Sequence, residues 1–491
     1  MTKSQSFVRA GRNVWRVERA DRFAVIVDAD DYFRHARAAM LTARKRIMLV
    51  GWDFDARILL GDGEDAGPDA PRKVGDFIYW LVEQNPKLEI YLLRWDLGAL
   101  KTLVRGSTIL TLAKWMRHPR IHTKLDGCHP TGASHHQKIV VIDDRMAFCG
   151  GIDMTGDRWD TREHRDDDPR RKRPTGRKYG PWHDATSALD GPVAAALGEH
   201  CRERWKRAGA GALRPVKGGE AHWPAGLEPD FTAVEVGIAR TWPDWANHPK
   251  VDEIERLYVD MIAAATRTIY AESQYFASRA IAEALCKRLE EEDGPEVVIV
   301  NPESADGWLE QQAIDTARER LVEHLHRTRF GKERFRIYHP VTKSGEPIYV
   351  HAKILIIDDR AIRVGSSNFN NRSLGLDSEC DVVIDAARAG NADCTARIAA
   401  IRDDLLAEHL GTTAAKVSKA IAAKGIVAAV ESLRGKGRTL APYEARDLAG
   451  VSAWLADNEV LDPIGPGAAF EDLGKRSLVR RIAHRIRHRT G

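Results

Sequence analysis

HQKIVVIDDR at residues 136–145 recurs as HAKILIIDDR at residues 351–360. Seven of the ten positions are identical, and the two histidines that begin the copies lie 215 residues apart. That separation indicates a duplicated domain, because the units of repeat proteins are only roughly 20 to 50 residues long. A chain built in this way can bring two copies of one His/Lys pair to a single site.

Each copy has the sequence pattern of a buried strand. The four residues after each lysine are all apolar, as expected for a strand that is covered on both faces. Side chains two positions apart on a strand point to the same face. The histidine and the lysine of each copy should therefore project together, which pairs His136 with Lys138 and His351 with Lys353.

A hairpin turn is predicted after each apolar run, where both copies read Asp-Asp-Arg. We interpret the first acid of each turn, Asp143 and Asp358, as a turn or ion-pair residue and not as a catalyst, because four strand residues separate it from the lysine. Each hairpin leads into a turn of small residues, which lets backbone approach a ligand closely. These turns are Gly150-Gly151-Ile152-Asp153 and Gly365-Ser366-Ser367-Asn368.

Two imidazoles and two ammonium groups around one anion are suited to phosphodiester cleavage. One imidazole can attack phosphorus and form a phosphohistidine, while the other can protonate the leaving alkoxide and then activate water. Lysines supply positive charge to the phosphoryl oxygens. We assign His136 as the nucleophile and His351 as the general acid/base, although the similarity of the halves leaves the reverse assignment open. Lys138 and Lys353 are assigned to phosphate binding.

The two motifs resemble the duplicated HKD motif of the phospholipase D superfamily. Their flanks resemble phospholipases D proper at Ser134–Lys138, at Pro181-Trp182-His183-Asp184 and at Ile269–Phe276. The resemblance covers about residues 12–410. It implies an α/β fold of two pseudo-symmetric lobes, each a mixed β-sheet flanked by helices.

The resemblance also implies further site residues. A carboxylate should stand behind each histidine to fix its tautomer and orientation, and the matching positions are Asp184 and Glu379. Asp153 stands in the first turn where the second has an asparagine, so we do not assign Asp153 to phosphate. The residues expected beside the substrate are Ser366, Asn368, Gly151 and Gln274.

The duplication divides the chain into parts. We expect a first lobe over residues 12–209, a second over 230–410 and a helical extension over 411–491. A helix followed by a strand is predicted at Asp31–Arg46 and Ile47–Trp52, and again at Val251–Thr266 and Thr268–Tyr275.

Two charged segments stand out from the lobes. The extension ends in Lys475–Gly491, which is rich in arginine, lacks acids and has amphipathic spacing. This basic tail could lie on an anionic membrane, dock on the protein or fray. Arg162–Lys178, dense in charge of both signs, is interpreted as a solvated loop, with a lid or headgroup loop as the alternative.

The composition limits which partners and which cellular compartment we expect for the protein. The net charge of +4 does not demand a polyanionic partner. Six cysteines without a CxxC pair argue against a zinc site and a disulfide framework, and favour a reducing compartment. The N-terminus lacks a signal-like apolar core, and no apolar stretch is long enough to span a membrane. We therefore expect a cytoplasmic monomer, peripherally associated with membrane, that needs no metal or cofactor for its chemistry.

The resemblance implies a phospholipase D that converts a phosphatidylcholine-like lipid and water into phosphatidic acid and an alcohol, with transphosphatidylation capacity. The main alternative is a cardiolipin-synthase-like phosphatidyltransferase. A nuclease is disfavoured because no nucleic-acid-binding patch is evident. A non-catalytic membrane scaffold is disfavoured because both His/Lys pairs are intact.

Overall fold

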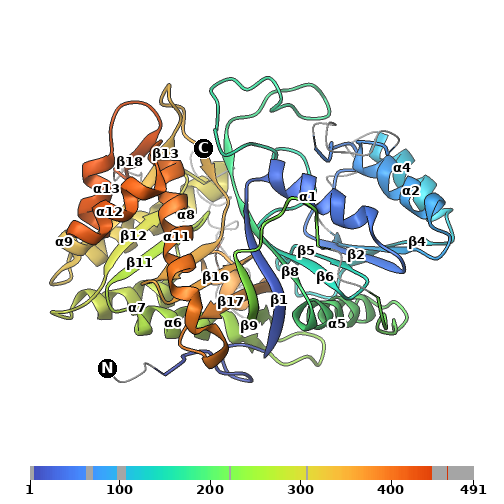
Figure 1. Cartoon of the computed structure of the whole chain (residues 1–491), viewed down its shortest axis with the longest axis horizontal. Helices are drawn as coiled ribbons and strands as arrows, with labels where there is room; N and C mark the ends of the chain where they lie inside the picture. The colour runs from blue at the N-terminus through green and yellow to red at the C-terminus, as the bar shows by residue number, and fades with distance from the viewer. Residues whose placement is uncertain are drawn as a thin grey trace, which may run out of the picture.

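One mixed sheet runs through both halves of the chain (Figure 1). The computed structural model describes residues 5–61, 70–96, 107–219, 223–305, 308–444 and 462. Within these residues, sixteen strands form the sheet, in the order β18-β13-β12-β11-β15-β16-β17-β9-β1-β8-β6-β5-β2-β3-β4, with β10 paired to β9. Helices cover both of its faces, so the predicted α/β class is confirmed.

The sheet repeats one strand order in its two halves. Outward from the middle, β1-β8-β6-β5-β2-β3-β4 in the first half corresponds to β9-β17-β16-β15-β11-β12-β13 in the second. The first-half strands are β1 (Arg16–Val27), β2 (Arg46–Gly51), β3 (Glu89–Trp95), β4 (Ile121–Asp126), β5 (Ile139–Ile142), β6 (Met146–Gly150) and β8 (Ala185–Asp190). The second-half strands are β9 (Phe231–Trp242), β10 (Val251–Asp252), β11 (Thr268–Glu272), β12 (Glu296–Val300), β13 (Phe335–Val341), β15 (Ile354–Ile357), β16 (Ala361–Gly365) and β17 (Glu379–Asp385).

The halves join along β1 and β9, which pair antiparallel in the middle of the sheet. Their register runs from Arg16 opposite Ile238 to Phe23 opposite Phe231, and the two phenylalanine rings meet edge to face at 6.0 Å. The two predicted lobes, each a mixed sheet flanked by helices, are confirmed. Their sheets join into one through the pairing of β1 with β9.

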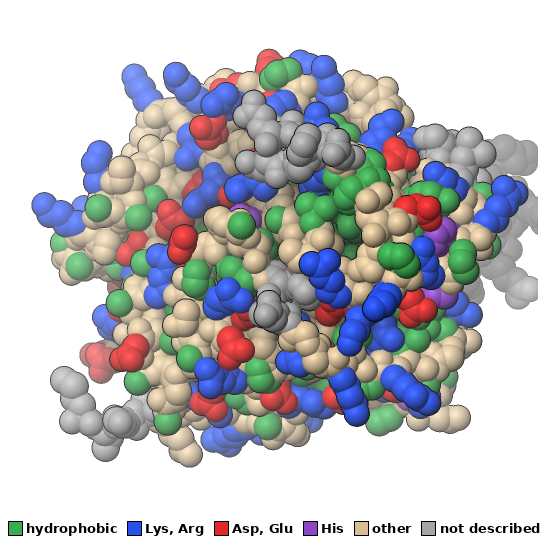
Figure 2. All heavy atoms as spheres, turned by 45° about the vertical axis from the view of Figure 1, so that its right-hand side comes forward, with side chains coloured by type: hydrophobic (Ala, Val, Ile, Leu, Met, Phe, Trp, Pro, Cys, Tyr) green, Lys and Arg blue, Asp and Glu red, His purple; other side chains and the backbone are tan. Residues whose placement is uncertain are grey.

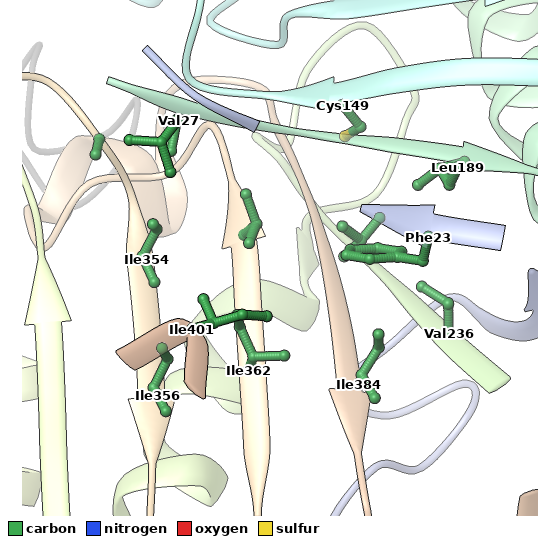
Figure 3. Close-up of a cluster of buried hydrophobic side chains, with 14 of the residues drawn as sticks. Phe23, Val27, Cys149, Leu189, Val236, Ile354, Ile356, Ile362, Ile384 and Ile401 are labelled. Carbon is green, nitrogen blue, oxygen red and sulfur yellow. The ribbon is translucent and has the colours of Figure 1, made fainter. Parts of the chain in front are cut away.

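The core follows the two-residue period of the strands. In β2, Ile47 and Leu49 pack with α1 and α2, while Met48 and Val50 face the opposite core with α5. That second core continues across both halves, as Figure 3 shows for side chains of β1, β9, β15 and α11. The helices are α1 (Ala29–Leu41), α2 (Val74–Gln84), α4 (Ser107–Met116), α5 (Pro192–Arg207), α6 (Glu253–Ala264), α7 (Arg279–Leu289), α8 (Trp308–His326), α9 (Gly331–Arg334), α10 (Asn371–Gly375), the 3-10 helix Ala389–Cys394 and α11 (Thr395–His409).

The described part of the C-terminal extension packs on the second half. It forms α12 (Ala414–Lys424), α13 (Ile426–Leu433) and β18 (Thr439–Pro442), and β18 pairs antiparallel with β13. The Tyr338 hydroxyl donates a hydrogen bond to Glu431 at 2.6 Å. The basic tail Lys475–Gly491 lies outside the described residues. None of the described helices is both long enough and apolar enough to cross a membrane.

The motif aspartates hold backbone at the far end of the motif strands. Asp143 accepts hydrogen bonds from the amides of residues 44, 45 and 46, just before β2, at 2.6–2.8 Å. Asp358 accepts from those of residues 266, 267 and 268, just before β11, at 2.7–2.9 Å. Both aspartates have φ of 51°, as their tight turns require. Each carboxylate therefore fixes the backbone at the point where a neighbouring strand begins.

We predict that Asp143→Ala and Asp358→Ala lower the free energy of unfolding by about 1–3 kcal/mol, because each leaves backbone donors without their acceptor. Chemical denaturation followed by circular dichroism measures this. The exposed Asp293 provides the control, since Asp293→Ala removes a carboxylate from the surface. Unchanged stability in both motif variants would contradict the structural role.

Candidate active site

The two motif histidines face each other across the junction of the halves. Their ring centroids lie 6.4 Å apart, with 60° between the ring planes. His136 directly precedes the Gln137-Lys138 lead into β5, and His351 occupies the same position before β15. The His136 side chain is 15% exposed and that of His351 is 5% exposed. The site is therefore enclosed but open to a ligand beside His136.

Each histidine receives its carboxylate from the opposite half. His136 Nδ1 lies 3.0 Å from Glu379 Oε1, and His351 Nδ1 lies 2.7 Å from Asp184 Oδ2. The sequence nominated both acids, and the structure brings each beside a histidine. Because Nδ1 faces the acid in both cases, Nε2 is the nitrogen that remains for a ligand.

Backbone hydrogen bonds repeat this crossing. The His136 amide donates to the Ser378 carbonyl at 2.9 Å, and the His351 amide donates to the His183 carbonyl at 2.7 Å. The second contact belongs to a two-stranded parallel sheet of β7 (Trp182–His183) and β14 (Tyr349–Val350). The residue before each acid thus holds the backbone of the histidine that the acid serves.

Small and hydroxyl-bearing residues position the two acids. Ser366 donates its hydroxyl to Glu379, and Ser373 donates to the same carboxylate at 2.8 Å. A Cβ on Gly151 would lie 2.3 Å from Asp184 Oδ1, so only glycine fits there. In this structure Ser366 and Gly151, which the sequence placed beside the substrate, contact the acids that hold the histidines.

The two lysines have different surroundings. Lys138 Nζ lies 3.0 Å from Asp153 and donates to the His136 carbonyl at 2.7 Å. Lys353 donates to the His351 carbonyl, but the residue that corresponds to Asp153 is the neutral Asn368. Asn368 approaches Gln274 at 3.5 Å, which brings two more of the predicted substrate residues together. The positive charge of the site is therefore concentrated on the second half.

Burial sets the ionisation of the site. It is the main cause that lowers the pKa of His136 and of His351 well below the usual range, and the nearby lysines lower both further. Burial also raises the pKa of Glu379 to about 8, raises that of Asp184 and lowers the pKa of Lys353 to about 7. These shifts favour neutral imidazoles in the absence of a ligand. A bound anion would offset the lysine charges and favour a protonated histidine.

Several residues that line the site around the histidines were not assigned from the sequence. Trp182 stacks on Tyr349 with 4.6 Å between ring centroids, and its ring lies 5.3 Å from that of His351. Arg158 stands over Trp182 at 4.3 Å and contributes to lowering the pKa of His351. The sequence does not single out Arg158, because it lies beside a segment with many charged residues. Trp182 could have been found, because it belongs to the Trp-His-Asp segment that provides Asp184.

The chain matches two family models. The model described as phospholipase D matches residues 39–222, and the model described as cardiolipin synthase, PLD-like domain, matches residues 258–399. The first range contains His136 and Asp184, and the second contains His351 and Glu379. Each half therefore carries its own match.

Similar proteins agree with these family matches. Phospholipase D A of Dictyostelium discoideum is 25% identical over 452 residues, which cover 76% of this chain and 34% of that protein. Phospholipase D alpha 1 of Carica papaya is 24% identical over 512 residues, covering 76% and 63%. The chain thus spans between about a third and two thirds of these relatives. A crystal structure of phosphatidylserine synthase from Haemophilus influenzae has the same fold, with a TM-score of 0.51, 14% identity, and coverage of 77% of this chain and 86% of that one.

We predict that the low pKa of Lys353 makes anion binding depend on pH. Its ammonium group is charged below about pH 7 and loses its proton above it. Binding of tungstate, whose charge is constant in this range, should weaken about tenfold per pH unit above about pH 7, because the bound anion requires the proton back. Isothermal titration calorimetry measures the affinity. Lys353→Arg keeps its charge and should reduce the slope by the part that Lys353 contributes, leaving the part that comes from proton uptake by a histidine. An equal slope in that variant would assign all of it to another group.

Proposed function

The chain belongs to the phospholipase D superfamily, and from this premise we propose that it is a phospholipase D. Its reaction would hydrolyse the distal phosphodiester of a phosphatidylcholine-like glycerophospholipid to phosphatidic acid and the headgroup alcohol. The single observation that carries the proposal is the facing pair of histidines, 6.4 Å apart, each backed by a carboxylate.

In the first step, the neutral His136 attacks phosphorus through Nε2. Glu379, whose pKa burial raises to about 8, shares a proton with Nδ1, and its ionised form stabilises the positive charge that develops on the ring. The bond between phosphorus and the headgroup oxygen breaks, and protonated His351 gives its proton to that oxygen. A phosphatidyl-histidine and a free alcohol result.

In the second step, His351 is neutral and acts as the base. It takes a proton from water, whose oxygen attacks phosphorus and breaks the bond to His136. Phosphatidic acid leaves, and the proton on His351 is available for the next turnover. Asp184 holds His351 in one orientation for both transfers, through its contact at Nδ1.

The negative charge of the incoming phosphodiester favours the protonated form of His351, which acts as the general acid. Two charges about 4 Å apart interact by about 4 kcal/mol at a surface-like effective dielectric of about 20. Burial is the main cause that lowers the pKa of His351, and the lysines lower it further, so an anion beside Lys138 and Lys353 offsets the part that the lysines contribute. Substrate binding and protonation of the general acid are coupled in this proposal.

A lipid substrate is supported by the site walls and by the relatives. Trp52, Trp182 and Tyr349 give the wall around the histidines an aromatic surface, and the two relatives described above are named phospholipases D. The match of the second half to a cardiolipin synthase domain favours the second candidate, a phosphatidyltransferase in which another lipid's alcohol replaces water.

A lipid substrate requires contact between the protein and a membrane surface. We propose that the protein binds this surface peripherally. Figure 2 shows Lys and Arg side chains beside hydrophobic ones on the face drawn there, with Asp and Glu side chains among them, and the basic and hydrophobic groups suit contact with an anionic interface. Cosedimentation with anionic vesicles tests this, with a chain that ends at residue 474 to test the predicted tail. Absence of vesicle binding by the full chain would refute a membrane-bound mode.

We predict that His136→Ala and His351→Ala each reduce kcat on phosphatidylcholine at least about 10³-fold, because each step uses both imidazoles. The double variant should be no worse than either single one. His118→Ala, which removes a histidine outside the site, is the control. Near-normal turnover by a folded His351→Ala protein would exclude the two-histidine mechanism.

A p-nitrophenyl phosphodiester can separate the roles of the two histidines. Its leaving group needs little protonation, so His351→Ala should still form a phosphohistidine, trapped by denaturation in alkali, whereas His136→Ala should form none. The opposite pattern would reverse the two assignments.

We predict that a primary alcohol at about 1–5% diverts the product from phosphatidic acid to the phosphatidyl-alcohol, because both acceptors attack the same intermediate. Mass spectrometry of the lipids measures the ratio. Phosphatidic acid should dominate in plain buffer. Cardiolipin as the main product from phosphatidylglycerol alone would favour the transferase, and reaction of a nucleic acid without reaction of either lipid would refute the lipid assignment.

A further inference from the structure

A second cluster of histidines and carboxylates lies inside the protein, next to the segment that carries Asp184. Its members are Asp28, His164, His183 and Glu408, and none of their side chains is more than 2% exposed. They come from the end of β1, the charged insertion, β7 and the end of α11. The insertion was interpreted as a solvated loop, but the structure buries its His164.

One nitrogen of each ring points into the centre of this cluster. His164 Nε2 lies 3.2 Å from Glu408 Oε1 and 3.5 Å from Asp28 Oδ2. His183 Nδ1 lies 2.9 Å from the same Glu408 oxygen and 3.4 Å from Asp28 Oδ1. One ligand atom from each of the four residues thus lies within 4.8 Å of all the others.

The outward nitrogen of each ring has a carboxylate of its own. His164 Nδ1 is hydrogen-bonded to Asp160 at 3.1 Å, and His183 Nε2 to Glu272 at 2.8 Å. Histidines that bind metals characteristically donate their other ring proton to such a carboxylate, which fixes the tautomer and orients the ring. Both rings therefore have the outer partner of a metal ligand.

Two atoms at the centre lack a hydrogen bond. Asp28 Oδ2 and His183 Nδ1 are buried without a hydrogen-bond partner among the described residues. His183 Nδ1 is close to Glu408, but the approach is not aligned for a hydrogen bond. Each of the two atoms has an ion-pair contact, at 3.5 and 2.9 Å, but no aligned hydrogen bond, and a bound cation would satisfy both.

We propose that this cluster binds one divalent metal ion of the zinc class. Zinc takes two imidazoles and two carboxylates readily, at about 2.0–2.2 Å and in tetrahedral geometry. A tetrahedron of that size separates its ligand atoms by about 3.3–3.6 Å. With Oδ2 as the Asp28 ligand, three of these separations in the cluster are 2.9, 3.2 and 3.5 Å. The cysteine spacing argued against zinc, but thiolates are only one kind of zinc ligand.

Arginines offset part of the negative charge around the cluster. Arg162 pairs with both Glu408 and Asp404, and Arg171 lies 3.3 Å from Asp160. More carboxylates than arginines remain, so a divalent ion would add positive charge at the centre in place of one proton on each imidazole.

The ion would fasten the backbone around Asp184. Asp28 accepts a hydrogen bond from the Asp184 amide at 3.0 Å, and the Asp28 amide donates to the Asp184 carbonyl at 2.8 Å. The His183 carbonyl also holds the His351 amide. The role is structural, since the four ligands leave no position for substrate, and the site does not depend on the proposed lipid chemistry.

Metal content of the whole chain tests the site without an activity assay. After purification with zinc and dialysis against metal-free buffer, we expect about one zinc per chain by mass spectrometry of the metal. Cobalt exchanged into the site should give the intense visible absorption of tetrahedral coordination, and zinc should abolish it.

Variants locate the ion. His164→Gln should lose the cobalt absorption, since it removes one ligand. His136→Gln and His118→Gln should keep it, which separates this cluster from the active site and from surface histidines. If His164→Gln does not fold, the wild-type spectrum and stoichiometry still decide. A folded wild-type chain with less than about a tenth of an equivalent of zinc and no tetrahedral cobalt absorption overturns the proposal.

Discussion

Each motif histidine depends on a carboxylate from the other half of the chain, so neither half holds a complete site. His136 and Glu379 are 243 residues apart, and His351 and Asp184 are 167 apart. The pairing of β1 with β9 sets this arrangement, because it fixes the position of every strand outward from the middle of the sheet. The parallel pairing of β7 with β14 then completes the crossing at the site itself.

The halves share a fold but differ in charge. Lys138 is paired with Asp153, whereas the equivalent turn of the second half offers only the neutral Asn368. Below about pH 7, where Lys353 is charged, the net positive charge that meets an anion therefore lies on Lys353. One side of the duplicated site is therefore nearly neutral and the other is cationic. Different surroundings shift the pKa values of the two histidines differently, which allows them to perform different chemical tasks.

Buried charge extends well beyond the two motifs. On one side of the site, Arg204 bridges Asp126 and Gln137, and Gln137 donates to the Glu379 carbonyl at 2.9 Å. On the other side, the cluster around His183 holds the backbone of Asp184. Buried charges are costly unless they are paired, so both networks constrain the geometry of the residues that they contact. The two acids behind the histidines are thus held by neighbours that are themselves fixed.

The sequence by itself determined the local features of this protein. Two-residue periodicity placed His136 with Lys138 and His351 with Lys353, and resemblance nominated Asp184 and Glu379. Only the tertiary structure decided which acid contacts which histidine and that the two sheets join into one. It also showed that His164, in a segment of many charged residues, is buried. The physical reason is that periodicity reports which face a side chain occupies, whereas its partner across more than a hundred residues depends on strand order and packing.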